Sequence, residues 1–207
     1  MADVAPSGAA GTEAGAVPGR DHRYDVEVVH LLVSPEHAYF GRPKDGAVDV
    51  PTTDADRVEL VAGKGIVGDR FFGKAAHMDA AVTLFAVEAL EAIAAELGAG
   101  RFDPMLTRRN VVLRGAQLAP LLGQEFVLDS RGASVRLRAG RPAHPCAWMD
   151  RVLAPGAHAA MRGRGGVRCQ VISGGYLHRG PAVLVSPVPL EPERAGEAVR
   201  RLPSRLP

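Results

Sequence analysis

The sequence contains few cysteines, few aromatic residues and no long apolar run, and each shortage excludes a class of protein. Two cysteines, Cys146 and Cys169, cannot form a disulfide framework or a four-thiolate zinc site. No run of eighteen apolar residues is present, which excludes a transmembrane helix. The N-terminus lacks a basic stretch followed by an apolar one, so a signal peptide is not expected. The sequence therefore predicts a globular, cytoplasmic protein without a membrane partner.

The composition is sufficient for one sizeable core, because 46% of the 207 residues are hydrophobic. The 24 glycines and 16 prolines indicate many turns, which argues against a simple helix bundle. Residues 1–22 are rich in Ala and Gly without apolar periodicity, so we expect a disordered tail. Residues 187–207 form a proline-rich C-terminal tail, in which residues 191–202 could form one short surface helix. The domain then spans residues 23–186.

Short segments rich in β-branched residues or Leu, bounded by Gly, Pro or Asp, dominate this domain. They predict strands over residues 25–33, 57–62, 81–85, 110–114, 125–129, 134–138, 167–172 and 182–186. One helix is expected after the third strand, since Val87, Leu90, Ala94 and Leu97 recur at helical spacing before Gly98. Weaker helical turns are expected over residues 147–153 and 157–162. The fold class is mainly β (α+β), a closed or half-closed β-barrel with a few short helices.

Charge is distributed unevenly along the chain. Residues 23–100 carry 7 Lys or Arg against 13 Asp or Glu, whereas residues 101–179 carry 13 Arg against 4 acidic residues. The arginine side chain is suited to bidentate capture of phosphate or carboxylate. The second half is therefore a candidate for holding an anionic ligand. The alternative is that the two halves neutralise each other across the fold.

Residues 63–68 match the pattern G-x-G-x-x-G and follow a predicted strand. A dinucleotide site requires that the last glycine opens a helix, and the residues after Gly68 have no helical period. We expect instead a tight loop in which glycine permits close approach of the backbone.

The two cysteines differ in their sequence context. Cys169 alternates with Val167 and Val171 on one face of a strand, which predicts a buried side chain. Cys146 follows Pro145 where a helical turn could begin, and nearby Arg141 and Arg151 would favour its thiolate. A thiolate can bind a soft metal, carry a persulfide or attack an electrophile. An ordinary loop cysteine is the alternative.

Two arginine clusters are candidate anion sites, and two histidines are candidate acid–base groups. Arg108, Arg109 and Asn110 precede an apolar strand, and residues 162–166 (Arg-Gly-Arg-Gly-Gly) have the composition of a backbone anion nest. His77 and His144 flank these segments, with surface or structural roles as the alternative. The histidine spacing does not support a zinc site.

Several segments occur in an order that resembles the MOSC domain, the family of the C-terminal domain of molybdenum cofactor sulfurase. They are residues 65–70 (GIVGDR), His77, residues 82–85 (VTLF), Glu88, residues 108–112 (RRNVV), 121–126 (LLGQEF), 145–146 (PC), 164–167 (RGGV) and 171–175 (VISGG), and Gly180. The chain departs from the pattern at Pro181, where an acidic residue is usual. Because residues 1–22 cannot supply an N-terminal barrel, the chain resembles the free-standing bacterial type.

The resemblance implies a barrel with an arginine-lined pocket and one functional cysteine. Cys146 matches the cysteine that ligates molybdenum of a pterin cofactor in relatives that reduce amidoximes, and Arg108 and Asn110 match their Arg-x-Asn element. We expect Arg164 to help bind the cofactor, together with residues in or beside the first matching segments, namely Lys64, Arg70 and His77. Cys146 and His144 are the expected catalytic residues.

The first functional hypothesis is therefore a molybdenum-dependent enzyme that reduces a small N-hydroxylated substrate with electrons from a separate donor protein. The second is a sulfur-transfer protein that carries a persulfide on Cys146, supplied by a cysteine desulfurase. The third is a non-catalytic barrel that binds anions or nucleic acid. A nucleic-acid partner is not favoured, because residues 101–179 contain only four aromatic residues for base stacking.

Overall fold

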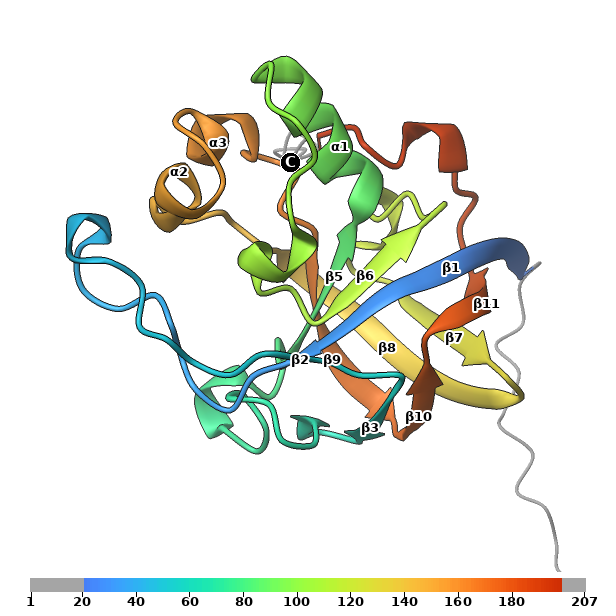
Figure 1. Cartoon of the computed structure of the whole chain (residues 1–207). Coiled ribbons are helices and arrows are strands. Elements are labelled where there is room, and N and C mark those ends of the chain that lie inside the picture. The colour runs from blue at the N-terminus through green and yellow to red at the C-terminus, as the bar shows by residue number, and fades with distance from the viewer. Residues whose placement is uncertain (1–20, 199–207) are drawn as a thin grey trace, which may run out of the picture.

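Seven strands form a closed barrel in the computed structural model, which describes residues 21–198 (Figure 1). The barrel strands are β1 (His22–Val33), β5 (Val82–Ala86), β6 (Val111–Arg114), β7 (Glu125–Ser130), β8 (Ala133–Pro142), β9 (Val167–Ser173) and β11 (Gly180–Ser186). Their order is β11-β7-β8-β9-β5-β6-β1, and pairing of β1 with β11 closes the barrel. Of these pairs, β5–β6 is parallel and the others are antiparallel. The mainly β, barrel-type fold expected from the sequence is confirmed.

Helix α1 (Val87–Glu96) makes the crossover that a parallel pair requires, because it connects β5 to β6. The other α-helices of the described residues, α2 (Trp148–Val152) and α3 (Ala157–Ala160), lie in the connection between β8 and β9. Short 3-10 turns are η1 (Pro43–Asp45), η2 (Ala75–His77), η3 (Pro104–Thr107), η4 (Ala119–Leu121) and η5 (Pro192–Arg194). Within residues 21–198, none of the helices has the length and apolar character needed to cross a bilayer.

All eight predicted strands are present, and the structure adds three short ones, β2 (Thr53–Asp54), β4 (Gly65–Ile66) and β10 (Gly175–His178). β2 pairs with the end of β1, whereas β4 and β10 flank the predicted strand β3 (Arg57–Val61) in a small second sheet. This second sheet packs on the barrel through its buried side chains, which are Val58, Leu60, Ile66 and Leu177.

The residues of β5 are buried on both faces of the strand. Val82 and Leu84 point into the barrel core, whereas Phe85 packs in a second core with α1, α2 and α3. A strand covered on both sides reads as a continuous apolar run, as residues 81–85 do. β5 therefore packs against the barrel core on one face and the second core on the other, next to the segments that carry Arg109 and Cys146.

The glycines of residues 63–68 form the tight loop that the sequence predicted. A Cβ atom on Gly65 would lie 2.8 Å from the Cβ of Ala81, so only glycine permits this approach of β4 to the start of β5. Residues 67–74 contain turns and no helix. A dinucleotide site would need a helix that starts at Gly68, so the expectation that this segment is not such a site agrees with the structure.

The termini differ in part from the expected tails. Residues 1–20 lie outside the described residues, and His22 already belongs to β1. Leu190 and Ala195 are buried in the barrel core, so residues 187–195 pack on the domain. The helix expected over residues 191–202 is reduced to the single 3-10 turn η5, and residues 199–202 lie outside the described part. Within the described part of this segment, Gly196 packs closely on the Glu88 carbonyl, since a Cβ atom there would lie 3.0 Å from its oxygen.

Candidate functional site

A cavity of about 190 Å³ lies where the segment after β1, the ends of β5 and β9, and the segment before α2 meet. Four arginines and one cysteine line it together with polar, aromatic and apolar side chains. The lining residues are His37, Ala38, Tyr39, Arg70, Phe71, Thr83, Thr107, Arg108, Arg109, His144, Cys146, Met149 and Arg168. Among the described residues, no carboxylate lines this cavity.

Cys146 is exposed at the cavity, two residues before α2. Its carbonyl accepts a hydrogen bond from the Met149 amide over 3.0 Å, and Trp148 and Met149 are buried in the second core. The backbone beside the thiol is thus anchored while the sulfur stays accessible. Cys169, in contrast, is fully buried in the barrel, and burial raises the pKa of its thiol. The predicted difference between the two cysteines in burial is confirmed.

The buried side chain of Asn110 joins three segments behind the cavity. Its Nδ2 donates to the Leu32 carbonyl over 3.2 Å and to Oδ2 of Asp69 over 3.0 Å. Its Oδ1 accepts a hydrogen bond from the Thr83 amide over 3.1 Å. The polar groups of Asn110 are therefore engaged within the protein, and its role is to organise the residues that line the cavity.

Asp69, held by Asn110, in turn binds Arg70 and the backbone beside it. Its Oδ1 accepts from the Phe71 amide over 3.1 Å, and its Oδ2 receives Nη1 of Arg70 at 3.3 Å. Nη2 of Arg70 donates to the Arg108 carbonyl over 3.2 Å, whereas Nε is buried without a hydrogen-bond partner in the described structure. Burial lowers the pKa of Arg70, and the neighbouring Asp69 carboxylate opposes this.

Arg109 is a buried guanidinium without a carboxylate partner among residues 21–198. Only 8% of the residue is exposed, Nη2 donates to the His144 carbonyl over 3.1 Å, and Nε has no partner. Burial, reinforced by the charge of Arg168, lowers the pKa of Arg109 to about 10. A buried charge is normally paired, because removing it from water is costly. Arg109 therefore indicates a place for an anion.

Arg168 adds a second unpaired cation to the cavity. It lies on β9 opposite Thr83 of β5, is half-buried, and makes no ion pair within the described part of the chain. Burial lowers the pKa of Arg168, and the charge of Arg141 lowers it further. An anion in the cavity would relieve both effects.

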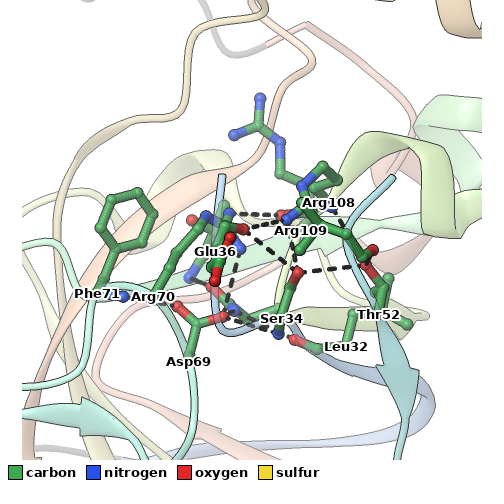
Figure 2. A network of polar contacts seen from close by, with 12 residues as sticks. Leu32, Ser34, Glu36, Thr52, Asp69, Arg70, Phe71, Arg108 and Arg109 are labelled. Atoms are coloured by element: carbon green, nitrogen blue, oxygen red, sulfur yellow. Dashed lines mark hydrogen bonds and ion pairs between the residues drawn. The ribbon is translucent and has the colours of Figure 1, made fainter. Parts of the chain in front are cut away.

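Arg108 faces away from Arg109 and secures the segment that follows β1. Its Nη2 donates to Oγ of Ser34 and to the Glu36 carbonyl, each over 2.6 Å, and its Nη1 donates to Oγ1 of Thr52 over 3.2 Å (Figure 2). These contacts join the two ends of the segment between β1 and β2. Arg108 itself has a left-handed backbone, with φ of 54°, which separates its direction from that of Arg109.

The segment secured by Arg108 supplies an aromatic wall. The ring of Tyr39 stacks on Trp148 of α2 at 5.4 Å, and its hydroxyl donates to the Leu106 carbonyl. The ring of His37 packs edge-on against Phe71 at 5.1 Å. Partial burial lowers the pKa of His37, and the charges of Arg70 and Arg108 lower it further.

The structure brings together some of the predicted site residues and separates others. Cys146, His144, Arg70 and Arg108 line the cavity, although His144 contacts Arg109 through its carbonyl, and Asn110 lies behind the cavity. Arg164 points away and pairs with Glu96 of α1. It lines a different cavity, with Gln117.

Lys64 and His77 also lie outside the lining of the Cys146 cavity. Lys64 is exposed in the turn between β3 and β4. His77 packs its ring against Phe71 at 4.5 Å, so it supports the wall of the cavity from behind, and its buried Nδ1 has no partner among the described atoms.

The glycine-rich residues 162–166 serve close packing and not the anion nest predicted for them. A Cβ atom on Gly165 would collide with the Ala143 carbonyl oxygen, and one on Gly166 would collide with the Leu84 carbonyl oxygen. These glycines allow the loop to press against β5 and the segment before Cys146.

Sequence reasoning missed eight residues that line the cavity, and the four with charged or aromatic side chains are Arg168, His37, Tyr39 and Phe71. Arg168 had a usable signal, since it alternates with the buried Val167 and Cys169 and must face out of the barrel core. His37 and Tyr39 had none, because the segment after β1 is irregular and is held by Arg108, and Phe71 lies in the turns after β4, where no periodic pattern marks its direction.

A family model for the MOSC domain matches residues 63–184, which is more than half of the chain. The chain belongs to the MOSC domain family. The matched region contains Arg70, Arg109, Cys146 and Arg168, whereas His37 and Tyr39 precede it.

Several solved structures share the fold of this chain at low sequence identity. The YuaD protein from Bacillus subtilis is 18% identical with a TM-score of 0.62, and the match covers 80% of this chain and 98% of that one. YiiM from Escherichia coli is 19% identical with a TM-score of 0.53, covering 86% and 76%. YiiM from Geobacillus stearothermophilus is 14% identical with a TM-score of 0.54, covering 84% and 80%. A search of curated proteins found no match.

Proposed function

We propose that this MOSC protein binds a molybdenum–pterin cofactor at the Cys146 cavity and reduces small N-hydroxylated compounds. The observation that carries the proposal is the buried, unpaired guanidinium of Arg109 in the same cavity as an exposed thiol. The cofactor is anionic through its phosphate and needs a soft ligand for its metal, and the residues present fit both requirements.

The charges at the cavity support this assignment. Four guanidinium groups line the cavity, and the Asp69 carboxylate behind Arg70 and an ionised Cys146 thiol would offset two of these charges, which leaves a net charge of about +2 for an anion to neutralise. Arg109 and Arg168 would hold the phosphate, because neither has a carboxylate partner in the described structure. Within residues 21–198 no cluster of three or more His, Cys, Asp or Glu side chains could bind a metal, so Cys146 would be the protein's ligand.

The remaining residues have supporting roles in this proposal. The cofactor, when bound, would supply the electron pair that breaks the N–O bond of the substrate, and a separate donor protein would return two electrons to the cofactor. His144 is exposed at the cavity and would pass a proton to the departing oxygen. His37, Tyr39 and Phe71 form the wall that limits the access of water and substrate.

Elemental analysis tests the proposal. The full-length chain and its Cys146→Ser variant are produced in a host with ample molybdenum and purified in parallel. We expect molybdenum and a fluorescent pterin with the wild-type protein and a large loss of molybdenum from the variant. Arg114→Gln serves as the matched control, because Arg114 pairs with Glu91 outside the cavity. Equal, near-zero molybdenum in all three proteins would reject the proposal.

A second candidate function is the carriage of sulfur as a persulfide on Cys146. The cavity volume of about 190 Å³ favours it, since pockets that enclose a whole organic ligand usually measure about 300–1,000 Å³. Exposure of Cys146 also suits transfer between proteins. Incubation with a cysteine desulfurase followed by mass spectrometry tests this function. A mass increase of one sulfur atom on Cys146 supports it, and an unmodified thiol contradicts it.

A further inference from the structure

We propose that the Cys146 cavity takes a small dianionic sulfur donor of the thiosulfate type, and that Cys146 accepts its outer sulfur. The inference rests on the second candidate function, persulfide carriage, and names the donor.

The size and charge of the cavity fit a compact dianion. A volume of about 190 Å³ accommodates a tetrahedral oxyanion more readily than a larger organic donor. Arg109 and Arg168 lack carboxylate partners within the described residues, and Asp69 offsets only Arg70. With Arg108 and an ionised Cys146 included, the four arginines, Asp69 and the thiolate leave a net charge of about +2, which matches a dianion held by the guanidinium groups of Arg109 and Arg168.

The depth of the groups sets the orientation of such a donor. Arg109 is buried, whereas Cys146 is exposed at the same cavity. The oxyanion end therefore lies inward against the guanidinium groups, and the outer sulfur faces the thiol. This arrangement places the charge that develops on the leaving group next to the arginines.

The transfer step needs no oxidant or reductant. The Cys146 thiolate attacks the outer sulfur, a bond forms between Sγ and that sulfur, and the sulfur–sulfur bond of the donor breaks. Sulfite leaves with the electron pair of that bond, and Arg109 and Arg168 stabilise its charge. A nucleophile such as cyanide then takes the outer sulfur from the persulfide as thiocyanate and restores the Cys146 thiolate.

The test uses the full-length chain, purified from a host starved of molybdenum, and sodium thiosulfate. We expect a mass increase of one sulfur atom located on Cys146, with release of an equal amount of sulfite. The initial rate should saturate with thiosulfate, and sulfate should compete with it. Cys146→Ser should give no adduct. An absence of adduct in the wild-type protein, or an adduct on Cys169, would overturn the inference.

Two arginine variants separate binding in the cavity from simple reactivity of the thiol. Arg109→Gln should lower the rate at limiting thiosulfate at least about tenfold, whereas Arg114→Gln should leave it unchanged, with folding of both checked by circular dichroism. If Arg109→Gln does not fold, competition by sulfate in the wild-type protein still decides the point. An equal rate in a folded Arg109→Gln variant, or no competition by sulfate, would overturn the inference.

Failure of the thiosulfate proposal can be distinguished from failure of cofactor binding or of persulfide carriage. Formation of the adduct is measured without molybdenum, so it is independent of cofactor binding. An adduct that forms with a cysteine desulfurase but not with thiosulfate overturns the proposed donor and leaves persulfide carriage standing. If neither donor gives an adduct, both persulfide carriage and this inference are wrong.

Discussion

Nδ2 of Asn110 donates a hydrogen bond to Oδ2 of Asp69 across 3.0 Å, in the buried layer behind the Cys146 cavity. This bond joins the residues before β6 to the loop after β4, which are far apart in the sequence. Asp69 in turn holds Arg70, and the residue before Asn110 is Arg109. Two of the cavity's cations are therefore positioned by one pair of side chains that does not itself line the cavity.

Replacing Asn110 should destabilise the fold strongly. Asn110→Ala removes three hydrogen bonds, which leaves the Thr83 amide and the Leu32 carbonyl without these side-chain partners and takes one donor from the Asp69 carboxylate, so the free energy of unfolding should fall by about 2–4 kcal/mol. Asn110→Asp should be at least as harmful, because it places a second carboxylate beside Asp69. Urea unfolding followed by circular dichroism measures both. Wild-type stability in either variant would show that the pair does not position the cavity.

Arg108→Gln should release the segment between β1 and β2 without unfolding the barrel. The variant loses the bonds to Ser34, Glu36 and Thr52, so Tyr39 should no longer stack on Trp148. Trp148 is the only tryptophan in the chain, and its fluorescence and near-ultraviolet circular dichroism report this contact directly. Tyr39→Ala should reproduce the spectral change. A wild-type spectrum for Arg108→Gln would contradict the assigned role.

The titration of His37 should respond to an anion in the cavity. Its pKa is lowered by partial burial and by Arg70 and Arg108, so the neutral form persists below the usual range. A bound sulfate ion opposes those cations and should raise the pKa, and by linkage sulfate should bind more tightly as the pH falls through that pKa. Sulfate is suitable because its own charge is constant over this range. Two-dimensional NMR titration with and without sulfate, with His37→Gln for assignment, measures the shift; an unchanged midpoint would contradict the prediction.

The two thiols should differ sharply in reactivity. Cys146 is exposed, whereas Cys169 is enclosed in the barrel, where burial raises its pKa and disfavours the thiolate. An alkylating reagent should therefore modify Cys146 alone in the native protein and both thiols after unfolding in urea. Peptide mass spectrometry locates the label. Rapid native labelling of Cys169 would show that the barrel opens more readily than its packing suggests.

The barrel could be predicted from the sequence because its strands carry a clear local pattern. Segments such as β9 alternate buried and partly exposed residues, and β5 is apolar except for Thr83, so both are visible without knowledge of their partners. The two-residue strands β2 and β4 exist only because β1 and β3 lie beside them. No local pattern of two residues can reveal such pairing.

The site was only partly predictable, because side-chain direction depends on tertiary contacts. Arg108 and Arg109 are adjacent, identical in type and both line the cavity, yet Arg108 has a left-handed backbone and donates to Ser34, whereas Arg109 donates to the His144 carbonyl. The sequence favoured Arg108. Arg164 likewise lies beside glycines that suggested an anion nest, but these glycines serve close packing and Arg164 faces Glu96.

The measurement that tests the central claim most directly is calorimetric titration of the full-length protein with sulfate. If the cavity of Cys146 is an anion site formed by Arg109 and its neighbours, sulfate should bind at one site per chain. The affinity should fall at least about tenfold in Arg109→Gln and stay at the wild-type value in Arg114→Gln. Equal sulfate affinity in the wild-type protein and in a folded Arg109→Gln variant, or no binding to either, would contradict it.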